Sequence, residues 1–222
     1  MSTKERLLRA VQARVSAAEA PWLDQAMHDA SHGSQNQLLV VYTGASQHLG
    51  RAPLALSDGG PDVVDHWTVE DGGRLLFLLV RHEASPSPAA FIDAASSCYQ
   101  QGDAREQQSW LRAVAFLPDP ARFLPLVVDA CRTNILPLFE SVACENPYPA
   151  RHFPERNFNQ MVLKALFTGV ALARILGLPE RANPELARMA SDYADERRAA
   201  GRSIPVDIAL AMADRARTRT DT

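Results

Sequence analysis

Three prolines, Pro147, Pro149 and Pro154, lie close together in a chain whose pattern is otherwise helical nearly from end to end. Each proline fixes its own φ and lacks a backbone N–H, and it also biases the preceding residue toward extended geometry. The sequence therefore predicts that residues 144–157, here called the proline strap, form a rigid, non-helical loop between helices. A rigid loop rich in hydrogen-bonding side chains is a common place for a binding site.

Helix signals recur along the rest of the chain, whereas the alternating polar and apolar pattern of strands is hard to find. Asp119-Pro120 and Asn183-Pro184 are each typical of a helix start, with an N-cap followed by a first-turn proline. Thr68 is expected to cap a further helix, and residues 75–80 form a buried helix or, as the minority interpretation, a buried strand. Roughly ten helices with short connections predict an all-α fold of stacked antiparallel helical hairpins, α-solenoid-like as in TPR or HEAT proteins.

The chain has 222 residues, of which 46% are hydrophobic and 22% charged. These values suit one domain whose core needs neither disulfides nor metal. We expect a single helical domain over residues 1–216, made of a variable helical part at 1–129 and a more distinctive part at 130–205. A last helix is predicted from Pro205 to Arg215, and a frayed tail at 217–222.

Charge and hydropathy exclude several classes of protein. The formal net charge is −3 and the sequence pI is about 6.1, which argues against a nucleic-acid-binding protein. The longest apolar run, residues 161–178, is broken by Lys164 and Arg174 and predicts a core helix rather than a membrane span. No secretory signal is recognisable at the start, and three scattered cysteines suit a reduced compartment, so a cytoplasmic location is expected.

Two constellations could carry chemistry. Asp24, His28 and His32 share one helix face, and two histidines at this spacing can chelate a metal. No further ligand pattern accompanies them, so a solvated face is favoured, and neither a metal nor another cofactor is predicted. The Cys144-Glu145 pair near His152 could form a thiol nucleophile with a base, although spacing alone is weak support and no catalytic residue is assigned.

Basic and polar side chains in and after the strap form the candidate ligand-binding or partner-binding site. The predicted helix at 158–176 carries a narrow polar stripe that either faces solvent or lines a groove opposite the strap, where burial would lower the pKa of its lysine. In the predicted helix at 184–200, one arginine lies on the apolar face and needs a partner, by reaching outward or toward the strap. The stripe consists of Asn157, Gln160, Lys164 and Thr168, and the candidate site residues are Asn146, Tyr148, Arg151, His152, Asn157, Lys164 and Arg197.

The C-terminal part of the chain resembles a known bacterial family. The resemblance is carried by Ala130-Cys-Arg-Thr-Asn134, by Cys144-Glu-Asn-Pro-Tyr-Pro-Ala-Arg-His-Phe-Pro154, by 158–167, by 183–189 and by Tyr193-Ala-Asp-Glu-Arg-Arg-Ala-Ala-Gly-Arg202. These segments resemble the EboA family closely over residues 130–205. Before residue 130 only Leu49-Gly-Arg-Ala-Pro-Leu54 is similar.

The resemblance implies a biological setting and no certain reaction. EboA proteins are encoded in clusters with a UbiA-like prenyltransferase and other enzyme-like proteins, which are linked to secondary metabolism and to delivery of metabolite precursors to the periplasm. From the stacked-hairpin fold in this setting we expect a non-catalytic scaffold or adaptor whose partners are other Ebo-cluster proteins. The alternative is a small-molecule-binding protein or enzyme that acts on an anionic or prenylated metabolite in a pocket beside the strap.

Overall fold

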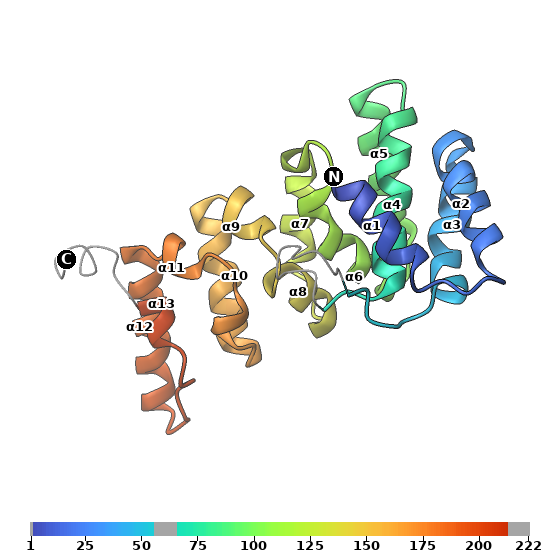
Figure 1. Ribbon diagram of the computed structural model, residues 1–222. Helices are drawn as coiled ribbons and strands as arrows, with labels where there is room; N and C mark the ends of the chain where they lie inside the picture. Colours follow the sequence, from blue (N-terminus) through green and yellow to red (C-terminus); the bar gives the residue numbers. More distant parts are fainter. Residues whose placement is uncertain (1, 56–65, 213–222) are drawn as a thin grey trace. The chain divides into compact units, whose positions relative to one another are not determined.

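The computed structural model describes residues 2–55 and 66–212 (Figure 1). Helices make up 72% of the structure, and the described ranges contain no strand, only an isolated bridge between Pro53 and Thr68. The all-α prediction is therefore confirmed, and ten α-helices of seven or more residues are described. The solenoid-like stacking stays a prediction, and the predicted tail at 217–222 lies outside the described residues.

The chain divides into two compact units, Met1–Leu126 and Val127–Thr222, with α7 (Leu124–Ala130) running across the boundary. The expectation of one domain over residues 1–216 stays a prediction. The helices of the first unit are α1 (Thr3–Gln12), α2 (Ala20–His32), α3 (Gln35–His48), α4 (Val69–Ala84), α5 (Pro88–Gln101) and α6 (Ala104–Ala113), followed by the short 3-10 helices η2 (Val114–Phe116) and η3 (Pro120–Phe123).

Helix α4 is the centre of the first unit, where it packs against α1, α2, α3, α5 and α6 (Figure 1). Its apolar residues 75–78 are buried on all sides, so the helix interpretation of this run is correct and the strand interpretation is wrong. Thr68 caps it as predicted and exchanges hydrogen bonds with Asp71 in a capping box. Gly73 permits the close packing, because a Cβ there would lie 2.1 Å from a methyl carbon of Leu49.

The second unit is organised around α10, which packs against α8, α12 and η4. Helix α12 also packs against α13, and α8 against the short α9. The side chain of Asn183 caps α12 by accepting a hydrogen bond from the Leu186 N–H, as its sequence predicts. The elements after α7 are α8 (Leu136–Ala143), α9 (Tyr148–His152), α10 (Glu155–Thr168), η4 (Leu172–Arg174), α11 (Leu178–Arg181), α12 (Pro184–Ala199) and α13 (Ala209–Met212).

Four local predictions are wrong. The last helix, predicted to begin at Pro205, begins at Ala209, because residues 206–208 form a turn first; its predicted end at Arg215 lies outside the described residues. The strap is not free of helix, because α9 forms inside it, with Pro149 in the first turn, where a missing N–H leaves no bond unmade. The helix predicted through residue 176 ends at Thr168, since Gly169 adopts a left-handed φ of 76° and stops it. Asp119 is left-handed with a φ of 49°, and its side chain does not cap the 3-10 helix that follows.

Candidate functional site

The strap begins with a turn that its own side chains hold. Asn146 is buried, and its side-chain amide donates to the carbonyl of Ser141 at 2.9 Å while its amide oxygen accepts from the backbone N–H of Tyr148 at 2.9 Å. A side-chain oxygen that accepts from the backbone two residues on replaces a backbone turn. Asn146 therefore shapes the strap from within, and its side chain is directed at the backbone.

Arg181, at the end of α11, ties the far end of the strap to the rest of the unit. It donates from Nη1 to the carbonyl of Ala150 at 2.7 Å and from Nη2 to the carbonyl of Phe153 at 2.8 Å. Its guanidinium also lies 4.7 Å from the ring centre of Phe158. The carbonyls at the end of a helix have no partner within the helix, so an arginine placed here satisfies the end of α9.

Of the four predicted site residues at 146–152, Asn146 and Tyr148 are buried, whereas Arg151 and His152 are at least partly exposed. Tyr148 is fully buried, and burial raises the pKa of its hydroxyl. His152 is half-buried with its ring 4.6 Å from that of Tyr148, while Arg151 is exposed. Burial, and next the charge of Arg151, lower the pKa of His152, so the ring is predominantly neutral near neutral pH.

A pocket of about 310 Å³ lies between the end of α7, the strap and α10, and is called the strap pocket here. Asn157 and Lys164 line it, whereas the other five predicted site residues do not. Asn157, Gln160 and Lys164 of the polar stripe therefore border a cavity beside the strap, while Thr168 does not. The lining residues are Val128, Cys131, Arg132, Phe153, Asn157, Gln160, Met161 and Lys164.

Lys164 has firm backbone partners on one side of the pocket. Its ammonium donates to the carbonyls of Cys131 at 2.6 Å and Thr133 at 2.5 Å, and lies 4.8 Å from the ring centre of Phe139. Burial lowers the pKa of this amine, as the polar stripe suggested. Lys164 thus fixes the turn that leads from α7 to α8 and presents positive charge to the pocket.

Arg197 lies apart from the strap pocket, near the end of α12. Its Nε donates to the carbonyl of Ser203 at 2.8 Å, and its guanidinium lies 5.8 Å from the ring centre of Tyr193. An arginine on the apolar face of a helix needs a partner. Arg197 finds it in the backbone after the helix and in the ring of Tyr193 on the same helix.

Comparison with known proteins gives the chain a family. A family model described as metabolite traffic protein EboA matches residues 3–213. The chain belongs to the EboA family. The match extends well beyond residues 130–205, to both units. No curated protein and no solved structure matches the chain. Membership in the EboA family is consistent with a role related to metabolites.

The cysteines of this EboA chain are poorly suited to nucleophilic chemistry. Burial raises the pKa of Cys98, Cys131 and Cys144 to about 12 in each case. A thiol attacks as the thiolate, so these groups are almost entirely unreactive near neutral pH. The alternative of Cys144 as a nucleophile is thus unsupported. No helix among the described residues is long and apolar enough to cross a membrane, and those residues contain no cluster of His, Cys, Asp or Glu suited to a metal ion.

Sequence reasoning missed a buried charged network in the first unit of this EboA chain. Arg74 is 1% exposed and donates to the carbonyl of Tyr42 at 3.0 Å and to Ser109 at 2.8 Å. Ser109 in turn donates to the buried carboxylate of Asp71 at 2.5 Å. Glu70 pairs with Arg105, and burial raises the pKa of Glu70. The charges lie on α4 and α6, which are separated in sequence. The closely spaced charges of Glu70, Asp71 and Arg74 within α4 were therefore the available sequence signal for the network.

Proposed function

We propose that the protein is a non-catalytic helical scaffold or adaptor in metabolite traffic, within a secondary-metabolite pathway that delivers precursors for export to the periplasm. Its partners are other proteins encoded in Ebo clusters. The observation that carries the proposal is a pair of large apolar side chains on a fixed turn. Ile135 is 50% exposed and Leu136 is 42% exposed, directly after the backbone that Lys164 holds.

A fixed apolar turn suits a protein partner for two reasons. Burying these side chains on association would be favourable, at roughly 25 cal/mol for each Å² of apolar surface removed from water. The turn is already ordered, because Lys164 bonds to the carbonyl of Thr133 and the Thr133 hydroxyl accepts from the Ile135 N–H at 3.1 Å. Little conformational entropy would therefore be lost when a partner binds.

The test is a double variant, Ile135→Ser with Leu136→Ser, expressed in the native host in place of the wild type. We expect an unchanged melting temperature, together with loss of co-purification of proteins encoded in the same cluster and loss of pathway output. Val40→Ser is the matched control, because Val40 is 70% exposed in the first unit. Normal output and normal co-purification in the double variant would contradict the adaptor role.

A second candidate function, binding of or catalysis on a small anionic or prenylated metabolite, is favoured by the strap pocket. Apolar side chains of Val128, Phe153 and Met161 line it together with positive charge from Lys164. Such a lining suits a molecule with an anionic head and an apolar body, and pockets for small molecules are lined in this mixed way.

The strap pocket can be tested without disturbing the backbone that Lys164 holds. Asn157→Leu with Gln160→Leu changes two lining side chains that make no hydrogen bond within the described part of the chain. If a metabolite binds here, mass spectrometry of metabolites extracted from the purified protein should detect a compound in the wild type that the variant lacks. An identical extract from both proteins would exclude the pocket as the site.

A further inference from the structure

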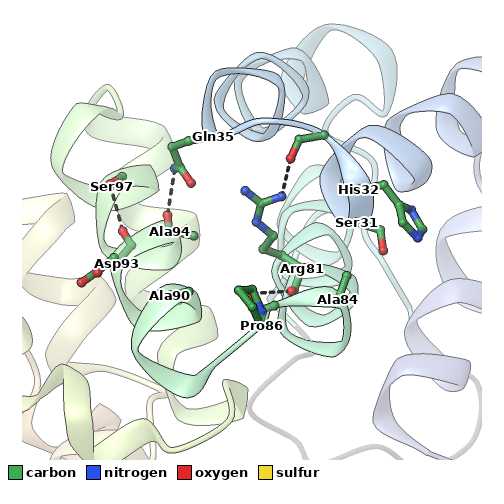
Figure 2. A pocket seen from close by; sticks show the side chains of 12 residues that line it. Ser31, His32, Gln35, Arg81, Ala84, Pro86, Ala90, Asp93, Ala94 and Ser97 are labelled. Atoms are coloured by element: carbon green, nitrogen blue, oxygen red, sulfur yellow. Dashed lines mark hydrogen bonds between the residues drawn. The ribbon is translucent and has the colours of Figure 1, made fainter.

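The first unit contains a larger pocket, of about 590 Å³, between the end of α2, the end of α4 and α5 (Figure 2). It is called the α4–α5 pocket here. The cavity exists because small side chains line it where helices face each other: Ala84, Ala90 and Ala94 leave space that larger residues would fill. The full lining is Ser31, His32, Gly33, Gln35, Arg81, Ala84, Ser85, Pro86, Ala90, Asp93, Ala94 and Ser97.

Arg81 is the side chain that brings charge into this space. Its Nη1 donates to the carbonyl of Gly33 at 2.6 Å and that of Ala30 at 3.4 Å, which fixes the guanidinium at the end of α2. Its Nε and Nη2 make no hydrogen bond to any residue within 2–55 or 66–212, and it has no carboxylate partner there. These two nitrogens form one edge of the guanidinium, the fork that binds a carboxylate or phosphate through two parallel bonds.

The other charged groups of the lining are turned away from this fork. Figure 2 shows the carboxylate of Asp93 pointing away from Arg81 on the far side of α5, and the ring of His32 pointing outward from α2. An anion at the fork would therefore meet the positive charge of Arg81 without facing the Asp93 carboxylate. A half-buried guanidinium in a partly enclosed space binds an anion more strongly than one in open water.

Gln35 supplies an acceptor beside the guanidinium. Its Nε2 donates to the carbonyl of Ala94 at 3.2 Å, and because a carbonyl can only accept, the nitrogen must occupy that position. The side-chain oxygen of Gln35 is then left to accept a hydrogen bond from a donor in the cavity, and Figure 2 shows this residue beside Arg81. A ligand that satisfies both residues carries an anionic group and a hydroxyl group.

We propose that the α4–α5 pocket is a binding site for a small hydroxylated anion, a hydroxycarboxylate or a hydroxyalkyl phosphate. The anionic group binds the Nε and Nη2 edge of Arg81, and the hydroxyl group donates to the side-chain oxygen of Gln35. The alanines contact the carbon skeleton. This site lies wholly within the first unit, so it stands independently of the adaptor turn and of the strap pocket.

The test uses two matched pairs of probes, lactate with propionate and glycerol 3-phosphate with propyl phosphate, titrated into the full-length protein and followed by ligand-observed NMR. We expect the hydroxylated member of at least one pair to bind more tightly than its partner, and the preferred pair identifies the anionic group. Arg81→Gln should weaken this binding at least about tenfold, because charge-assisted bonds are lost. Gln35→Leu should remove the preference for the hydroxylated member.

Two further variants separate binding from folding. Ala90→Leu fills the pocket from α5 and leaves the bonds of Arg81 intact, so it should abolish binding with the melting temperature unchanged. Arg122→Gln removes an exposed arginine of the same unit away from the pocket and should bind the probes as the wild type does. Failure of all four probes to bind would overturn the proposal, and so would wild-type affinity in Arg81→Gln or in Ala90→Leu.

Discussion

Arg174 holds Glu145 through two parallel hydrogen bonds, from Nε to Oε1 at 2.8 Å and from Nη2 to Oε2 at 3.0 Å. The same arginine accepts the Glu145 N–H at its carbonyl, at 2.9 Å, and pairs with Glu140. Glu145 needs this support because its φ of 48° is left-handed, a conformation that costs a residue with a side chain about 1 kcal/mol or more. The start of the strap is therefore fixed from η4, outside the strap itself.

Arg174→Gln should lower the free energy of unfolding by about 1 kcal/mol, since the pairs are partly exposed to solvent and screened by it. Urea unfolding followed by circular dichroism measures this change. Arg188→Gln is the control, because Arg188 pairs with Glu185 and Asp192 on an exposed helix surface and should have little effect. Equal losses in the two variants would contradict a special role for Arg174.

Gly177 and Gly169 offer a matched comparison, because both have left-handed φ angles, of 72° and 76°. Gly177→Ala should destabilise the protein more than Gly169→Ala does. Either alanine bears the conformational cost of about 1 kcal/mol. At Gly177 the new Cβ would also lie 2.6 Å from the Cβ of Ala150 in α9, whereas nothing lies within 4 Å at Gly169. The clash should add roughly 1–3 kcal/mol in urea unfolding.

The sequence predicted helix starts that depend on side chains close to the helix end. Thr68 and Asn183 are caps because their side chains reach N–H groups three residues away. The end of α10 was missed because apolar residues continue past Gly169, and apolar periodicity alone does not reveal a positive φ at a glycine. Asp119-Pro120 follows the same start pattern as Asn183-Pro184, yet its backbone turns left-handed and no cap forms.

The candidate site was only partly predictable, because it depends on contacts between distant residues. The polar stripe left open whether Asn157 and Lys164 face solvent or line a groove, and the strap pocket and the lowered pKa of Lys164 agree with the second alternative. The backbone carbonyls that Lys164 bonds, those of Cys131 and Thr133, lie before α8 and α9, and Arg181 bonds the strap from α11, so neither contact has a local signature. The α4–α5 pocket depends on small residues from separate helices, which looked like ordinary helix formers.

The lowered pKa of His152 predicts a pH dependence of stability. The unfolded chain takes up a proton on this ring near its ordinary pKa of 6.5, and the folded protein does so only at lower pH. The stability that the neutral ring contributes is therefore complete above the unfolded pKa of 6.5. It is lost as the pH falls from there through the lower pKa of the folded protein. Between about pH 7.5 and pH 5, the wild type should lose more stability than His152→Gln. An equal loss of unfolding free energy in the two proteins, measured by urea unfolding at both pH values, would contradict this.

The three cysteines should react slowly while the protein is folded. Their pKa values of about 12 leave far fewer thiolates at pH 8 than an exposed thiol has. We expect reaction with a disulfide reagent at least about a hundredfold slower in the native protein than in the denatured one. A single thiol reacting at the denatured rate would show that its surroundings open readily. Cys131, which lines the strap pocket, is the one to examine first.

The double variant Arg151→Ala with His152→Ala asks whether the outer face of the strap has a function. Arg151 is exposed, and His152 contacts the rest of the unit through its ring beside Tyr148, whereas Asn146 and Arg181 hold the backbone of the strap. We therefore expect the melting temperature to change little and the output of the pathway to be lost. Arg156→Ala, an exposed arginine in the first turn of α10, is the control and should retain output.

The alternative outcomes for this variant are distinct. If the two side chains only support the strap, the free energy of unfolding should fall by roughly 1–3 kcal/mol, as when buried contacts are lost, and output should fall with it. Arg181→Ala is the reference variant for that outcome, because it removes the bonds to the carbonyls of Ala150 and Phe153 and leaves the side chains of Arg151 and His152 in place. Wild-type stability together with wild-type output in the double variant would refute both roles and would leave Asn157 and Lys164, in the strap pocket, as the predicted residues to test next.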